Sequence, residues 1–245
     1  VLFRRQRQMC IRDSLRDLSF RALDILNEVD LILCEDTRKS RILFNEFNIM
    51  TKYDSLHEFT SFKNIEKYVS FLEEGNSIAL ISDAGTPLIS DPGFEIVKIA
   101  KEKNIFVNPL PGPSSVISAL VGSGLKIDKF IFEGFPPRKK QELENFLKCY
   151  LHEERTVVLF ESPRRIKKLV QSVTEILGKD RNVTLAKEIS KPHQKFISGS
   201  SQSLLNQIKK DNNLEKGEIV FLIEGTKEKS LSLIHISEPT RLVSI

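Results

Sequence analysis

The feature of this chain that most limits its fold is an apolar run that leads directly into a loop of small and turn-forming residues. Residues 78–81 (Ile-Ala-Leu-Ile) are typical of a buried strand, and residues 82–93 contain two glycines and two prolines. Such a loop lies at the carboxyl edge of a sheet, where open α/β sheets bind ligands. Gly85 tolerates backbone torsions closed to other residues, and Pro87 restricts the exit. The loop therefore predicts either a ligand-binding turn or a purely structural strand-to-helix turn.

Strand and helix patterns alternate along the rest of the chain. Apolar runs predict strands at 31–34, 77–81, 106–107, 130–132, 156–160, 183–186 and 218–223. Helical spacing of apolar residues predicts helices at 18–29, 42–47, 65–72, 95–102, 114–120, 140–151, 164–177 and 202–209. This alternation indicates a mostly parallel sheet with helices on both faces. A pause at Gly122-Ser123-Gly124 divides the pattern into two α/β domains, at 15–124 and 125–229, with a cleft between them.

Both ends of the chain break this pattern. Residues 9–14 and 233–241 resemble translated sequencing-adapter read-through, so we expect 1–14 and 230–245 to be non-native and to pack poorly. The first residues lack the apolar core of a secretory signal, and no apolar run approaches the roughly 20 residues that cross a bilayer. These observations predict a cytoplasmic protein without a membrane partner.

Composition excludes several classes of site. Cys10, Cys34 and Cys149 are far apart and form no CxxC pair, and the four histidines are scattered. We therefore expect neither a disulfide framework nor a metal site. The net charge of +4 permits a polyanionic partner. Basic residues cluster at 138–140 and at 164–168, and such clusters are either solvated helix faces or phosphate contacts.

Six phrases in fixed order resemble one family. They are Cys-Glu-Asp-Thr-Arg at 34–38, the loop at 82–93, Pro-Gly-Pro-Ser-Ser at 111–115, Phe-Glu-Gly-Phe at 132–135, Phe-Glu-Ser-Pro-Arg-Arg at 160–165 and Ala-Lys-Glu at 186–188. From about residue 15 to 225 the chain resembles the ribosomal RNA small-subunit methyltransferase I family, within the tetrapyrrole methylase superfamily. The resemblance implies the class III methyltransferase fold of two α/β domains, with S-adenosylmethionine in the cleft between them, and a homodimer.

The resemblance also implies an activity: methylation of the ribose 2′-hydroxyl of a cytidine in the decoding region of 16S rRNA, within the 30S subunit. Matched motifs place the cofactor against Asp83, Ala84, Gly85, Thr86, Ser114, Ser115, Glu161 and Ala186. For the RNA they favour Arg38, Arg138, Lys139, Lys140, Arg164 and Arg165.

A base would help the reaction, because a ribose hydroxyl is a poor nucleophile at neutral pH. Glu35, Asp36, Lys187 and Glu188 are candidates because each lies at or just after a predicted strand end. Alternative roles stay open for three of them. Glu35 and Asp36 could form an ion-paired network with Arg38, and Lys187 could be a surface lysine.

One departure and three rival functions complete the sequence-based prediction. The family begins with an apolar strand and a Pro-Ile-Gly-Asn type loop, of which only Leu15-Arg16-Asp17 remains here. Loss of that strand predicts a destabilised first domain and an inactive chain. The rivals are a precorrin-type C-methyltransferase, a non-catalytic RNA-binding protein and an NAD-dependent oxidoreductase. The last is disfavoured because no GxGxxG phrase follows a strand.

Overall fold

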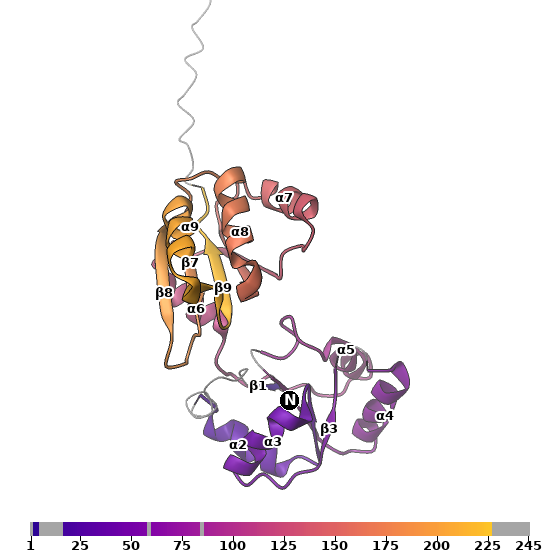
Figure 1. Ribbon diagram of the computed structural model, residues 1–245. Helices are drawn as coiled ribbons and strands as arrows, with labels where there is room; N and C mark the ends of the chain where they lie inside the picture. The colour runs from indigo at the N-terminus through magenta and orange to yellow at the C-terminus, as the bar shows by residue number, and fades with distance from the viewer. Residues whose placement is uncertain (1, 5–16, 58–59, 84–85, 227–245) are drawn as a thin grey trace, which may run out of the picture.

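The computed structural model describes residues 2–4, 17–57, 60–83 and 86–226, which gather into two bodies (Figure 1). The first body contains a four-stranded parallel sheet with the order β1-β4-β2-β3. Its elements are β1 Leu2–Arg4, α2 Phe20–Glu28, β2 Leu31–Cys34, α3 Thr37–Glu46, β3 Tyr53–Ser55, α4 Phe62–Glu73, β4 Ile78–Ser82 and α5 Phe94–Glu102.

Helices cover both faces of this sheet because successive residues of its central strands point to opposite sides. Ile32 and Ile81 pack with Leu26 of α2 and Phe44 of α3 on one face. On the other face, Leu33 and its neighbours pack against residues of α4 and α5. The predicted parallel sheet with helices on both sides is confirmed.

The second body is built on a five-stranded mixed sheet with the order β5-β6-β9-β7-β8. Its elements are α6 Ser115–Ser123, β5 Phe130–Gly134, α7 Lys140–Lys148, β6 Thr156–Glu161, α8 Pro163–Ile176, β7 Asn182–Lys187, β8 Lys195–Ser200, α9 Ser201–Lys210, η1 Asn212–Glu215 and β9 Ile219–Ile223. β5 runs parallel to β6, while β9 is antiparallel to both β6 and β7. The carboxyl ends of β5, β6 and β7 therefore share one edge of the sheet.

Helix α6 packs against the second sheet, where Figure 1 also draws it. Val116, Ala119 and Leu120 pack with Val158 and Leu222 on the face opposite to α7, α8 and α9. The sequence-based boundary at 124 had assigned this helix to the first domain. Because its apolar residues are buried by the second sheet, we propose that the boundary lies before Ser114.

Close approach of α6 to β8 depends on Gly122. A Cβ atom at this position would lie 2.5 Å from ring atoms of Phe196. We expect Gly122→Ala to lower the free energy of unfolding, because overpacking costs about 1–3 kcal/mol and the gain in helix propensity returns only about 1 kcal/mol. Urea unfolding measures the change, and the same substitution in a Phe196→Leu background should be stabilising. Equal effects in both backgrounds would show that this contact is not limiting.

Some predicted elements were wrong or missed. Phe106 and Val107 lie in no strand, and Phe106 is 83% exposed, so no burial favours an extended pairing there. The short strand β3 and the polar strand β8 were not predicted, since edge strands of this kind lack a continuous apolar run.

A short strand lies at the amino-terminal end of the chain. β1 pairs in parallel with β4, with Leu2 opposite Leu80, so three residues of the segment expected to be non-native form an edge strand. This strand occupies the edge of the first sheet beside β4, and the loss of the family's first strand and loop stays a prediction. Residues 5–16 and 227–245 lie outside the described residues. Within the described ranges, no helix has the length and apolar character needed to cross a bilayer.

Candidate functional site

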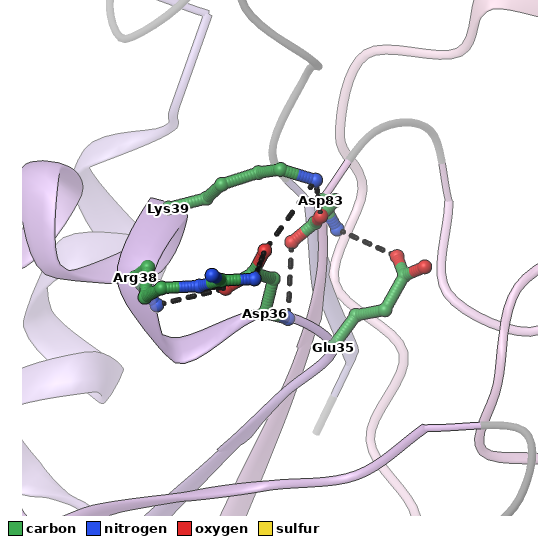
Figure 2. A network of polar contacts seen from close by, with 5 residues as sticks. All are labelled: Glu35, Asp36, Arg38, Lys39 and Asp83. Atoms are coloured by element: carbon green, nitrogen blue, oxygen red, sulfur yellow. Dashed lines mark hydrogen bonds and ion pairs between the residues drawn. The ribbon is translucent and has the colours of Figure 1, made fainter.

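The first half of the site is a polar network at the carboxyl ends of β2 and β4 (Figure 2). Asp83, directly after β4, accepts a hydrogen bond from the backbone N–H of Asp36 at 3.2 Å and forms an ion pair with Lys39. The backbone N–H of Asp83 in turn donates to Glu35 Oε2 at 3.4 Å. These contacts fix the two strand ends to each other.

Asp36 is the N-terminal cap of helix α3 and belongs to this network. Its side chain caps the helix by accepting a hydrogen bond from the backbone N–H of Arg38 at 3.0 Å, and it pairs with the Arg38 guanidinium at 3.2 Å. The hydrogen bond from the Arg38 side chain lowers the pKa of Asp36. A carboxylate at a helix N-terminus is also favoured by the helix dipole. Lys39, which the sequence-based prediction missed, lies one turn after Asp36 and reaches back to the buried Asp83.

The loop after β4 has an unusual backbone. Leu88 and Ser90 have φ angles of 74° and 61°, and Gly93 has 120°. A Cβ atom on Gly93 would lie 2.5 Å from Leu80 Cδ2, so packing and φ both require glycine there. Strained loop residues cluster at ligand sites. Thr86 is half-buried in this loop, whereas the predicted Ala84 and Gly85 lie outside the described residues.

The second half of the site lies at the shared carboxyl edge of β5, β6 and β7. Glu161 ends β6 and is only 3% exposed, although it carries a carboxylate. Its Oε1 accepts a hydrogen bond from the backbone N–H of Ser162 at 2.7 Å, and its Oε2 lies 3.3 Å from Arg165 Nη2. That second contact is an ion pair without hydrogen-bond geometry, so Oε2 has no hydrogen-bond donor in the described part of the chain. Burial raises the pKa of Glu161, against the opposing effects of Ser162 and Arg165.

Contact between the two halves occurs at Gly134, the last residue of β5. Gly134 has a φ of 66°, and a Cβ atom built on it would lie 3.1 Å from Ser90 Oγ in the loop after β4. The strained loop of the first body therefore lies against the carboxyl edge of the second sheet. This contact brings together the two edges at which the sequence placed ligand residues.

The side chains of the candidate bases differ in the hydrogen bonds that they already make. Lys187 Nζ donates a hydrogen bond to the backbone carbonyl of Asn213. Glu188 is 5% exposed and accepts hydrogen bonds from Lys191 Nζ at 3.1 Å and from the backbone N–H of Glu218 at 2.7 Å. Glu35 is half-buried, and its side chain has the one contact to Asp83 among the described residues. Their roles as bases stay predictions.

The remaining predicted cofactor residues lie on elements of the second body. Ser114 caps α6 by accepting from the backbone N–H of Ile117 at 3.4 Å, and Ser115 begins that helix. Ala186, in β7, is fully buried against α6. The exposed fraction of the whole residue is 0%, so neither its side chain nor its backbone is accessible in this structure.

Five of the six protein residues predicted to bind RNA are exposed cations, and the sixth is fixed by hydrogen bonds within the protein. Arg38, Arg138, Lys139, Lys140 and Arg164 are exposed. Arg165 instead donates two hydrogen bonds through Nη2, to the carbonyl oxygens of Pro136 at 3.1 Å and Pro137 at 2.8 Å. It thereby connects the first turn of α8 to the segment that carries Arg138. Nothing in the basic pattern distinguished Arg165 from Arg164.

A hollow of about 750 Å³ lies elsewhere on the first body. Its lining includes Asp30, Lys52 and Asn76, which precede β2, β3 and β4. Ligands of parallel α/β sheets bind at the opposite edge, so we do not assign the functional site to this hollow.

Replacing Glu161 tests how much its buried carboxylate lowers the stability of the fold. A carboxyl whose pKa is higher in the folded than in the unfolded chain destabilises the fold as pH rises between the two values. We therefore expect Glu161→Gln to raise the melting temperature at pH 7, with a gain that disappears toward pH 4. Thermal unfolding across this pH range measures it. A constant difference between the variants at every pH would contradict the expectation.

The fold and a matching family model together identify the class of protein. A family model described as Tetrapyrrole (Corrin/Porphyrin) Methylases matches residues 13–205, and the chain belongs to this family. Solved structures with the same fold include one titled diphthine synthase, with a TM-score of 0.67, 15% identity and coverage of 86% of this chain and 85% of the other. A cobalt precorrin-4 methyltransferase gives a TM-score of 0.59 at 17% identity, covering 86% and 90%. At this identity the likeness shows the fold alone.

Relatives of higher sequence identity identify one family within this class. The chain is 40% identical over 220 residues to "Ribosomal RNA small subunit methyltransferase I" of Escherichia coli O157:H7, covering 90% of this chain and 77% of that protein. It is 42% identical over 212 residues to the protein of that name from Thermotoga maritima, covering 86% and 94%. The chain therefore belongs to the ribosomal RNA small subunit methyltransferase I family, and the resemblance inferred from its motifs is confirmed.

Proposed function

We propose that this chain is an S-adenosylmethionine-dependent methyltransferase of 16S rRNA that acts on the ribose 2′-hydroxyl of a cytidine in the decoding region, within the 30S subunit. Relatives at 40–42% identity that carry the ribosomal RNA methyltransferase name support the RNA substrate. The observation that carries the proposal is the contact between Ser90 and Gly134, which joins two strand-end edges that each bear a buried carboxylate. A cytoplasmic location follows from a ribosomal substrate.

The residues at these edges fit S-adenosylmethionine. Among the described residues Glu161 Oε2 is a buried acceptor without a hydrogen-bond donor, and an adenosine offers hydroxyl and amino donors. Asp83 places a second buried carboxylate at the end of β4, at the start of a loop in which Leu88 and Ser90 have positive φ angles. When bound, the cofactor supplies an electrophilic methyl group on a sulfonium cation. The protein's part is to orient that group and the ribose oxygen and to exclude water.

Among the candidate bases the geometry favours Glu35. Its side chain is half-buried at the end of β2 and makes one long contact, at 3.4 Å, within the described residues. Glu188 and Lys187 are already held by Lys191 and by the carbonyl of Asn213. A carboxylate with free acceptor positions can take the proton of a hydroxyl within hydrogen-bond reach. We propose Glu35 for this role and a structural role for Glu188.

We also propose that the chain forms a homodimer. Ile117 and Val121 lie one turn apart on α6, and they are 50% and 72% exposed. Adjacent exposed apolar residues on one helix are typical of contact surfaces. Light scattering combined with gel filtration gives the oligomeric state directly.

The reaction is tested by mass mapping of 16S rRNA from a strain that lacks its own methyltransferase I, with and without this gene. The proposal predicts that one decoding-region cytidine regains a methyl group on its ribose. Recovery of the methyl group on a base, or at another nucleotide, would contradict the assignment to the 2′-hydroxyl. RNA binding without methylation would instead indicate a non-catalytic RNA-binding protein. Methylation of a tetrapyrrole macrocycle and not of RNA would indicate a precorrin-type enzyme.

A further inference from the structure

An exposed aromatic side chain lies at the point where the two bodies meet. Phe135 follows Gly134 directly, and 60% of it is exposed. Its ring centroid lies 5.6 Å from that of Phe160, which in turn lies 4.8 Å from that of Phe132. Phe132 and Phe160 pack against the apolar cluster beneath α6. One side of the Phe135 ring is thus anchored on a packed aromatic pair, and much of the rest is open.

The backbone around Phe135 is held on both sides. Before it, Gly134 ends β5 with a φ of 66° and lies against Ser90 of the first body. After it, Arg165 donates hydrogen bonds to the carbonyls of Pro136 and Pro137 and forms an ion pair with Glu161. Contacts of this kind immobilise a short segment. The ring is therefore presented in a fixed position beside the carboxyl edge of the second sheet.

Basic residues flank Phe135 in the sequence, and the hydrogen bonds of Arg165 hold the first turn of α8 against the two prolines that follow Phe135. Arg138, Lys139 and Lys140 follow the two prolines, and Arg164 precedes the arginine that holds them. Lys139 and Lys140 pair with glutamates of α7 at 3.0 Å and 3.8 Å, but both lysine side chains are more than 80% exposed. Exposed pairs of this kind contribute little, so both lysines can exchange their partners for phosphates.

A fixed aromatic face bordered by exposed cations has the properties of a single-stranded RNA site. Unstacked bases stack on aromatic side chains, while arginine and lysine neutralise the phosphates between them. We propose that Phe135 stacks on an unpaired base of the RNA substrate, next to phosphates bound by Arg138 and Lys139. This inference rests on the proposed function, because it names how the same site holds its RNA.

The test compares Phe135→Ala, Phe135→Leu and Phe135→Trp with the unchanged chain. Binding of a labelled single-stranded RNA with the decoding-region sequence is measured by fluorescence anisotropy at several salt concentrations. We expect Phe135→Ala to weaken binding by about 5- to 150-fold, the range found when one base-stacking aromatic is removed. Phe135→Trp should restore binding and Phe135→Leu should not, because leucine keeps apolar area without a ring face. The salt dependence should stay unchanged, since no charge is lost.

Two controls identify what the ring touches. Phe106→Ala removes a ring that is 83% exposed in the first body and should leave RNA binding unchanged. Calorimetry with S-adenosylmethionine should give equal affinities for the Phe135 variants and the unchanged chain. Weakened cofactor binding with unchanged RNA binding would assign the ring to the cofactor and overturn the proposal. A change in oligomeric state of the Phe135 variants would assign the ring to a contact between protein chains and would also overturn it.

The outcomes also separate this inference from the proposed function. If the unchanged chain methylates rRNA and Phe135→Ala binds RNA equally well, only the stacking role is wrong. If the unchanged chain does not bind the RNA, both are wrong.

Discussion

Replacement of Asp83 by alanine is expected to abolish binding of S-adenosylmethionine and to lower the free energy of unfolding by about 1–3 kcal/mol, the cost of leaving a buried partner unsatisfied. Asp83 is 2% exposed and holds both the Asp36 backbone N–H and Lys39. Without it, the ends of β2 and β4 lose their main polar connection (Figure 2). Because the loop after β4 begins at this residue, the loop loses its fixed starting point.

Asp30→Ala is a matched control for this substitution. Asp30 joins the same two strands at their opposite, amino edge, through hydrogen bonds from Ser77 N and Oγ at 2.8 Å and 2.7 Å. We expect Asp30→Ala to leave cofactor affinity unchanged and Asp83→Asn to have an intermediate effect, because asparagine keeps an acceptor for Asp36. Calorimetry and urea unfolding measure the two quantities separately. Normal cofactor affinity in a folded Asp83→Ala variant would show that this end of β4 does not hold the cofactor.

Simultaneous replacement of Arg138, Lys139 and Lys140 by alanine should weaken binding of the RNA by about 100-fold at 0.1 M salt. Each cation that neutralises a phosphate of a single strand contributes about 0.7 to the slope of log K against log salt, so three contribute about two. The side chains are exposed and belong to the loop after β5 and to the start of α7, so the fold should be unaffected. Binding measured across a range of salt concentrations gives both the affinity and the slope.

The control removes the same charge from another surface. Lys98, Lys101 and Lys103 lie on or just after α5 of the first body, and all three are exposed. Their replacement by alanine should change RNA affinity far less and keep the salt slope. If the two triple variants behaved alike, binding would depend on net charge, and the cluster at 138–140 would not be a specific contact.

Strand ends were the part of the site that sequence could predict. An apolar run is a local signal, and the residue that follows it must emerge at a sheet edge, so Asp83 and Glu161 could be located from the chain alone. The same reasoning missed β8 because an edge strand with lysine, serine and glycine carries no such run. It wrongly made a strand of Phe106 and Val107, where an apolar pair has no strand pairing.

Partners of charged and aromatic side chains could not be predicted in the same way. Arg164 and Arg165 are identical neighbours in the sequence, yet one is exposed and the other holds two proline carbonyls 28 and 29 residues away. Phe135 was part of a family phrase and received no role, because its exposure depends on which residues pack behind it.

The sequence by itself determined the family, the alternation of strands and helices, and the loops that follow buried strands, because each of these depends on residues close together in the chain. Only the tertiary structure decided that α6 packs on the second sheet, that Ser90 meets Gly134, and that Glu161 is buried with one oxygen that no donor in the described part of the chain hydrogen-bonds. These facts depend on contacts between residues far apart in sequence, whose burial and hydrogen-bonding partners are set only when the chain is folded.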